Sequence, residues 1–187
     1  MSNMTKRALA HSLKKLLART TLDKITIQNI VDDAEVSRKT FYYHFQDIYD
    51  LLEWTLVDEG RRVLEGRTTA DTWQQGLRDV LTSLQENQAV ILNLYRSAQE
   101  KDNPLEAHIT RMVEPLIRQI FESQPHCEQV GEEDRRFILE CYAYGLVKLV
   151  SYWVGRGMKP DAEQLMARVE RLFRGSMESL ILRCLEN

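Results

Sequence analysis

Residues 36–47, VSRKTFYYHFQD, form the segment that most constrains what this chain can fold into. Only Val36, Phe41 and Phe45 in it are apolar side chains of the core type. The two phenylalanines share one helix face because they lie four positions apart. The other side chains donate hydrogen bonds, carry positive charge or present aromatic rings. Such a helix fits with its back in a small core and its front in a DNA groove.

The residues before this segment complete the pattern of a helix-turn-helix. Thr26 and Ser37 are favourable N-cap residues, and each precedes a stretch with the apolar spacing of a helix. We therefore expect short helices near 26–34 and 37–45, joined by a tight turn. The helices on either side of them in the sequence would cover their back.

The chain as a whole is expected to be all-α. It has four prolines, no sustained strand alternation and no Gly/Ser linker. About nine helices are expected, the last five near residues 70–86, 88–100, 104–123, 132–156 and 161–185. This predicts an N-terminal helix-turn-helix domain of three helices over residues 1–47 and a second, helical domain over residues 48–187.

Charge is distributed unevenly along the chain. Residues 1–47 carry eight Lys or Arg and five Asp or Glu, a net charge of +3, whereas residues 48–187 carry a net charge of −6. A basic head on an acidic body fits contact with DNA at one end of the molecule.

Cysteine use and hydropathy indicate a cytoplasmic protein. The three cysteines are widely spaced, their number is odd and no CxxC occurs, which is typical of reduced thiols. No window approaches about 18 uninterrupted apolar residues, so we expect no membrane partner. The sequence also assembles no catalytic or metal-ligating constellation, and we expect neither an enzyme nor a cofactor or metal site.

The N-terminal segment resembles the TetR/AcrR family of transcriptional regulators. The resemblance runs from about Thr5 to Leu56 and is most specific over residues 25–52, ITIQNIVDDAEVSRKTFYYHFQDIYDLL. A second stretch, AYGLVKLVSYWVGRGMKPDAEQL at 143–165, resembles the branch that includes activators of dihydroxyacetone kinase operons. The resemblance implies an all-helical homodimer. Its N-terminal domain would bind a palindromic operator in double-stranded DNA, and its C-terminal domain would bind an effector and dimerise.

By position, the resemblance implies eight DNA-binding residues: Thr26, Ser37, Arg38, Lys39, Thr40, Tyr42, Tyr43 and His44. The two capping residues and the histidine match phosphate contacts, and the three residues from Arg38 match readers of base edges. The two tyrosines match aromatics that touch the backbone and thymine methyls. Gln46 and Ile48 stand where lysines are common in the family, which predicts a smaller electrostatic contribution to binding.

Two further surfaces are expected in the second domain. A mainly apolar effector pocket would be lined by Trp73, Leu94, Tyr95, His108, Met112, Cys141 and Tyr142. The same side chains fit a core or an interface, and that alternative stays open. The last two helices are apolar on more than one side, which predicts a dimer interface with Tyr144, Val147, Lys148, Ser151, Leu172, Phe173, Met177 and Leu180.

These features favour a DNA-binding regulator, most often a repressor released by a small-molecule or protein effector in the family that the chain resembles. An activator or coactivator of a neighbouring metabolic operon is the alternative within the same class. A helical interaction protein that does not bind DNA is the alternative from another class, and Arg38, Lys39, Thr40 and Tyr42 argue against it.

Overall fold

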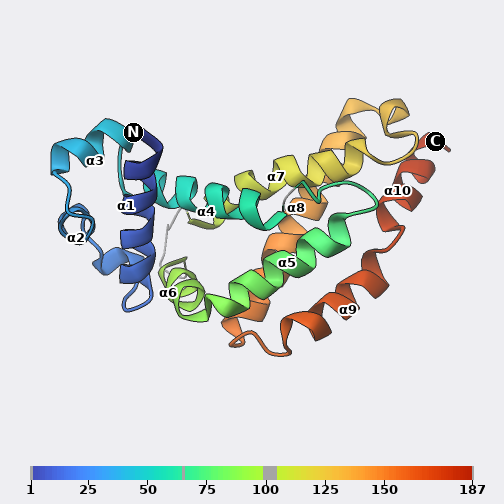
Figure 1. The fold of residues 1–187 in the computed structure, drawn as a ribbon. Coiled ribbons are helices and arrows are strands. Elements are labelled where there is room, and N and C mark those ends of the chain that lie inside the picture. The colour runs from blue at the N-terminus through green and yellow to red at the C-terminus, as the bar shows by residue number, and fades with distance from the viewer. Residues whose placement is uncertain (1, 65, 99–104, 187) are drawn as a thin grey trace. The chain divides into compact units, whose positions relative to one another are not determined.

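The computed structural model describes residues 2–64, 66–98 and 105–186, which contain helices and connecting segments and no strand (Figure 1). The expected all-α class is confirmed. In chain order the helices are α1 Ser2–Leu17, the 3-10 helix η1 Leu22–Lys24, α2 Ile27–Asp33, α3 Arg38–His44, α4 Ile48–Leu64, α5 Trp73–Glu86, α6 Gln88–Ala98, α7 Leu105–Glu122, the 3-10 helix η2 Cys127–Gln129, α8 Glu132–Gly155, α9 Ala162–Phe173 and α10 Ser176–Leu185.

The stretch expected as one helix over 161–185 is divided into α9 and α10. The break lies at Gly175, whose φ of 71° is in the left-handed region. Glycine adopts this conformation without the steric cost that a Cβ would bring. The apolar spacing continues on both sides of the break, so periodicity alone predicts a single helix.

The chain forms two compact units. The N-terminal unit comprises residues 1–60 and 87–108, and the C-terminal unit comprises residues 61–86 and 109–187. The N-terminal unit therefore includes α6, which lies beyond residue 47 in the sequence. The division of function at residue 47 stays a prediction.

Helix α1 lies at the centre of the N-terminal unit. It packs against α2, α3 and α6, and Figure 1 shows α6 beside its C-terminal end. The apolar side chains of this unit with 0% exposure come from four helices: Leu9, Leu13, Ile30, Phe41 and Leu51. The core behind the expected helix-turn-helix is thus built by the flanking helices, as the sequence predicts.

The C-terminal unit has a core formed by α7, α8 and α10. Its buried side chains include Ile117, Phe121, Leu139 and Ile181. Helices α5 and α9 pack side by side (Figure 1), and Arg78 on α5 bridges two carboxylates of α9. Its guanidinium lies 3.2 Å from Glu163 and 3.1 Å from Glu170.

The segment between α4 and α5 packs within the C-terminal unit, against α5 and α7. A Cβ built on Gly76 of α5 would lie 2.4 Å from the carbonyl oxygen of Arg67, so only glycine allows this approach. Arg67 also forms an ion pair with Asp79, and the Thr68 hydroxyl donates to Gln119 of α7. Close backbone approach and polar bonds therefore hold this segment against two helices.

Helix α8 is long and apolar enough by length and composition to cross a membrane, as many core helices of soluble proteins are. One side of α8 packs in the core of the C-terminal unit through Ile138, Leu139 and Ala143. Its exposed side carries the charged residues Glu140 and Lys148. A single helix of this kind is weak support for a membrane span.

The close approach at Gly76 leads to a prediction of stability. Gly76→Ala should lower the free energy of unfolding by about 1–3 kcal/mol, because the new methyl group forces a backbone shift. Gly60→Ala is the matched control, since Gly60 also lies inside a helix and a Cβ there meets nothing within 4 Å. The control should raise stability by about 0.5–1 kcal/mol through helix propensity. Denaturant unfolding measures both, and effects of equal sign would contradict the contact.

Candidate DNA-binding interface

Helix α2 begins with a reciprocal cap. The Thr26 hydroxyl accepts a hydrogen bond from the backbone N–H of Asn29 at 3.1 Å, and the Asn29 side chain accepts one from the backbone N–H of Thr26 at 2.9 Å. This capping box satisfies two N–H groups that the helix itself leaves without partners. It also fixes the direction in which the N-terminus of α2 points.

A tight turn joins α2 to α3. Glu35 has a φ of 53°, in the left-handed region that residues with a side chain rarely adopt. The N–H of Val36 donates to the carbonyl of Val31 at 3.0 Å and closes the end of α2. The tight turn expected between the two short helices is therefore present.

Helix α3 has a buried back and an exposed front. The Ser37 hydroxyl caps it by accepting from the N–H of Thr40 at 3.0 Å. Phe41 and Phe45 are 0% and 3% exposed, whereas Tyr42 and Tyr43 are 53% and 81% exposed. Both tyrosines are thus displayed, together with the exposed side chains of Arg38 and Lys39. Thr40 and His44 are half-buried at the margins of this face.

An aromatic and cationic cluster fixes the end of α3 to its neighbours. The rings of Phe45 and Trp54 meet edge to face with centroids 6.0 Å apart. The ammonium group of Lys6 on α1 lies 5.3 Å from the first ring and 5.7 Å from the second. Cation–π contacts of this kind stabilise when the ammonium lies within about 6 Å of the ring centre. The sequence does not predict this cluster, since no spacing pattern links these three positions.

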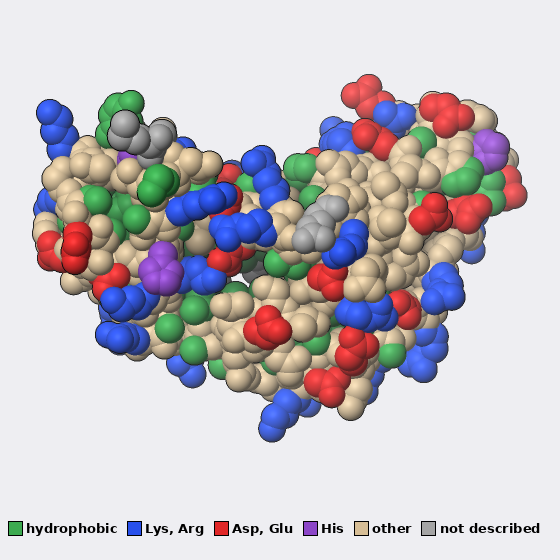
Figure 2. Space-filling model, in the orientation of Figure 1, with side chains coloured by type: hydrophobic (Ala, Val, Ile, Leu, Met, Phe, Trp, Pro, Cys, Tyr) green, Lys and Arg blue, Asp and Glu red, His purple; other side chains and the backbone are tan. Residues whose placement is uncertain are grey.

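Figure 2 shows one face of the molecule. The part of the surface over α1 to α3 carries several Lys and Arg side chains and few acidic ones, whereas acidic side chains are frequent over the C-terminal helices. This agrees with the charge division seen in the sequence. An ion pair between Lys15 and Asp33 ties α1 to the end of α2 and holds the pKa of that carboxyl below its ordinary value.

The residues expected to line an effector pocket fall into both compact units. Leu94 is buried in the N-terminal unit at 7% exposure, and Cys141 is exposed on α8. Tyr142 is half-buried, and this burial raises the pKa of its hydroxyl group. The hydroxyl groups of Tyr142 and Ser176 are hydrogen-bonded at 2.7 Å. The side chain of His108 lies outside the described residues. The remaining expected residues, Trp73, Tyr95 and Met112, are half-buried. The pocket they would form stays a prediction.

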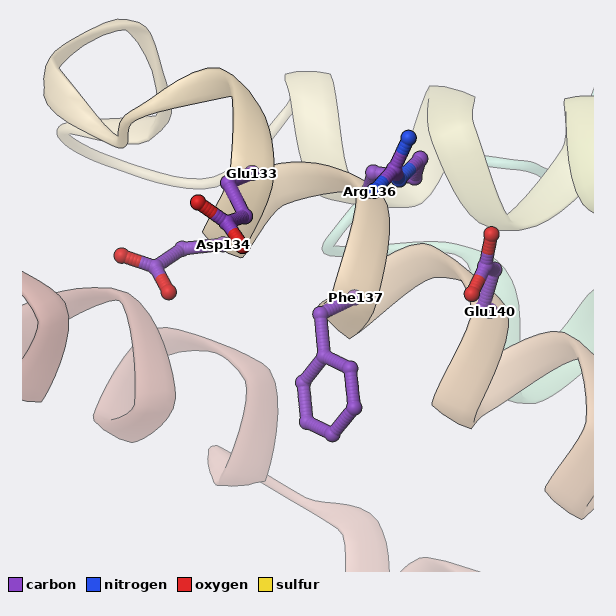
Figure 3. A pocket seen from close by; sticks show the side chains of 5 residues that line it. All are labelled: Glu133, Asp134, Arg136, Phe137 and Glu140. Carbon is purple, nitrogen blue, oxygen red and sulfur yellow. The ribbon is translucent and has the colours of Figure 1, made fainter.

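A shallow hollow of about 200 Å³ lies elsewhere, on the first turns of α8 (Figure 3). Its lining residues are Glu133, Asp134, Arg136, Phe137 and Glu140. Four of these side chains are charged and all come from one helix, so the hollow has the character of open surface. It contains none of the residues expected to bind an effector.

The residues expected at the dimer interface include both buried and exposed side chains. Val147 and Met177 are buried within the chain at 5% and 6%, and they are therefore core residues of the C-terminal unit. Tyr144 and Leu172 are exposed at 56% and 70%. Phe173, Leu180 and Lys148 are also exposed, and Ser151 is half-buried.

Comparison with known proteins identifies the family. The model described as "Bacterial regulatory proteins, tetR family" matches residues 11–54, and the model described as "Transcriptional regulator C-terminal region" matches residues 71–175, more than half of the chain. DhaS of Lactococcus lactis subsp. lactis (strain IL1403), an HTH-type transcriptional activator of the dhaKLM operon, is 29% identical over 87 residues. The match covers 46% of this chain and 46% of DhaS, so the chain spans about half the length of that relative.

Two solved structures share the fold. One is the dihydroxyacetone kinase operon activator DhaS, with 21% identity, a TM-score of 0.68 and coverage of 93% of this chain and 96% of that one. The other is a TetR transcriptional regulator from Streptococcus agalactiae 2603V, with 23% identity, a TM-score of 0.61 and coverage of 91% and 94%. With its capped helix-turn-helix and the two family matches, the chain belongs to the TetR family of DNA-binding transcriptional regulators.

Proposed function

We propose that this chain acts as a homodimer that binds a palindromic operator through α3 and releases it when an effector binds, as a repressor. The observation that carries the proposal is the division of α3 into two faces. Its phenylalanines are buried, while Arg38, Lys39, Tyr42 and Tyr43 project outward. A helix with this front presents hydrogen-bond donors and aromatic rings to base edges and phosphates.

We propose how these residues contact DNA from their positions in α2 and α3. The caps Thr26 and Ser37 stand at helix N-termini, where free N–H groups and the helix dipole favour phosphate. Arg38 lies in the first turn of α3, which enters the major groove first in helix-turn-helix proteins. Because operator DNA is bound inside the bacterial cell, we propose a cytoplasmic location, and we propose no catalytic role.

An activator is the second candidate. The likeness to DhaS favours it, because that relative is named as the activator of a kinase operon. Transcription from the bound promoter, measured with and without the protein, distinguishes a repressor from an activator. The effector of either form is proposed to be a small molecule or a partner protein.

The proposed dimer would form through the exposed apolar side chains of α8, α9 and α10. Phe137, Tyr144 and Tyr152 lie at helical spacing on α8 and are 56–66% exposed. Leu172 adds a further exposed apolar side chain from α9. Exposed apolar side chains of this kind fit burial against a second copy across a two-fold axis.

The base-reading role of Arg38 is tested by two substitutions. Arg38→Ala should cost about 1–3 kcal/mol on the operator and relax base preference, if the side chain reads a guanine. His44→Ala should weaken binding to all sequences alike, because a phosphate contact carries no base information. Titration of an operator duplex and a random duplex measures both. Equal losses on the two duplexes for Arg38→Ala would refute base reading.

Two substitutions at Ser37 distinguish its role as a helix cap from its proposed role in DNA contact. Ser37→Ala should lower stability by about 1 kcal/mol, whereas Ser37→Asp should keep it, because aspartate is an equally good cap. The carboxylate would repel phosphate, so Ser37→Asp should weaken duplex binding more than Ser37→Ala does. Thermal unfolding and duplex titration give the two rankings. A Ser37→Asp chain that binds DNA as tightly as the wild type would remove Ser37 from the interface.

The dimer surface is tested by charge insertion. Tyr144→Asp should convert the dimer into monomers at micromolar concentration, because a buried interfacial aromatic commonly contributes about 2 kcal/mol or more. Tyr43→Asp is the matched control, since Tyr43 is an exposed tyrosine on the DNA face. Sedimentation should show monomers for the first variant and dimers for the second. A wild-type monomer would refute the proposed assembly.

A further inference from the structure

Helix α6 is bound to α1 and η1, the two elements that precede α2, by two buried polar side chains, Asn93 and Ser97. Asn93 donates from Nδ2 to the carbonyl oxygen of Leu17 at 2.8 Å. Ser97 accepts at Oγ from the N–H of Leu22, also at 2.8 Å. The partners lie 76 and 75 positions apart in the sequence. We call this pair of side chains the α6 latch.

The two bonds satisfy backbone groups that have no partner in their own helices. Leu17 is the last residue of α1, and the final carbonyls of an α-helix lack intrahelical donors. Leu22 is the first residue of η1 and is only 4% exposed, so water does not readily replace the serine hydroxyl. The α6 latch therefore forms hydrogen bonds to both ends of the segment that connects α1 to η1.

The geometry of the latch is fixed from within α6. The Ser97 hydroxyl donates to the carbonyl of Asn93 at 3.0 Å, which leaves its lone pairs for the N–H of Leu22. Arg96 donates to Oδ1 of Asn93 at 3.0 Å. Because arginine is donor-only, this bond assigns the amide oxygen and turns the amide NH₂ group towards Leu17. Asn93 and Ser97 are 9% and 1% exposed.

The latch lies close in sequence to the DNA face. Leu22 precedes Thr26, the cap of α2, by four residues, and the intervening Ile25 is buried at 4% exposure. The position of Leu22 therefore sets where α2 begins. Since a tight turn joins α2 to α3, displacement of the first helix also displaces the second.

We infer that Asn93 and Ser97 are positioning residues for DNA binding. Through Leu17 and Leu22 they hold the N-terminus of α2 in the orientation that meets phosphate. Neither side chain touches DNA, and neither carries charge. Their loss should therefore weaken binding to all duplexes without changing base preference or the dependence of affinity on salt. This inference rests on the proposed operator binding.

The experiment compares four variants on one operator duplex, selected from a random pool by the wild-type protein, and on a random duplex. Ser97→Ala removes the acceptor for Leu22, and Asn93→Asp removes the donor to Leu17 at constant size. Ser97→Thr keeps the hydroxyl. Ser123→Ala is the control in the other unit, because the Ser123 hydroxyl, directly after α7, also accepts from a distant N–H, that of Ala70, and donates to the carbonyl of Ile120 in α7.

Ser97→Ala and Asn93→Asp should bind both duplexes roughly tenfold more weakly, with the salt slope of the wild type. Ser97→Thr and Ser123→Ala should bind as the wild type does. Hydrogen exchange supplies a local readout, since the Leu22 amide should lose protection in Ser97→Ala and regain it in Ser97→Thr. General destabilisation would instead accelerate exchange across the whole N-terminal unit.

Wild-type affinity in Ser97→Ala, or weaker binding with the Leu22 amide still protected, would overturn the inference. If Ser97→Ala does not fold, a folded Asn93→Asp chain with undiminished affinity overturns it equally. A wild-type protein that selects no duplex and binds no random DNA at low salt would refute the proposed function, and the positioning role with it. The first two outcomes leave the proposed function intact.

Discussion

The proposed DNA face depends on the burial of Phe41 on α3 and of Phe45 directly after it. Seven residues are too few for a helix to be stable alone in water, so α3 exists because Phe41 and Phe45 pack into the N-terminal core. Tyr43 lies two positions from Phe41, about 200° around the helix, and must then face outward. Its exposure of 81% is the direct consequence. Core packing thus decides which side chains of α3 are exposed and available for the proposed contact with DNA.

Three kinds of contact hold this short helix pair from behind. Local caps fix where α2 and α3 begin, and the ring cluster of Phe45 and Trp54 with Lys6 fixes where α3 ends. The α6 latch fixes the connection that precedes α2. These contacts differ in sequence range from three residues to more than seventy. The interface is therefore a product of the whole N-terminal unit and not of the helix-turn-helix alone.

The sequence predicts the parts of this arrangement that depend on local rules. The caps at Thr26 and Ser37, the turn between them and the inward phenylalanines follow from propensity and helical spacing. The placement of α6 does not, because Asn93 and Ser97 look like ordinary polar residues until their distant backbone partners are known. Leu94 shows a related limit. Its spacing fits a pocket or a core, and only the packing of α6 on α1 and η1 shows that it is buried in the N-terminal unit, while the pocket stays a prediction. Likewise, helical spacing cannot distinguish Val147, which is buried in its own chain, from the exposed Tyr144.

The chain passes between its two compact units at three places. The chain passes from one compact unit to the other inside α4, after Gly60, and inside α7, after residue 108. It also passes between α5 and α6, where Asn87 alone separates the two helices. Continuous helices resist bending, so crossings inside them carry displacement better than flexible linkers would.

Contacts close to two of these crossings hold the chain in place. After the crossing in α4, the close approach of Arg67 to Gly76 holds the segment that follows α4 against α5. Beyond the α5–α6 crossing, the α6 latch joins the chain to α1 and η1. The two units are therefore joined covalently at three places, and the proposed effector needs different affinities for two states of the protein if it is to shift α2 and α3.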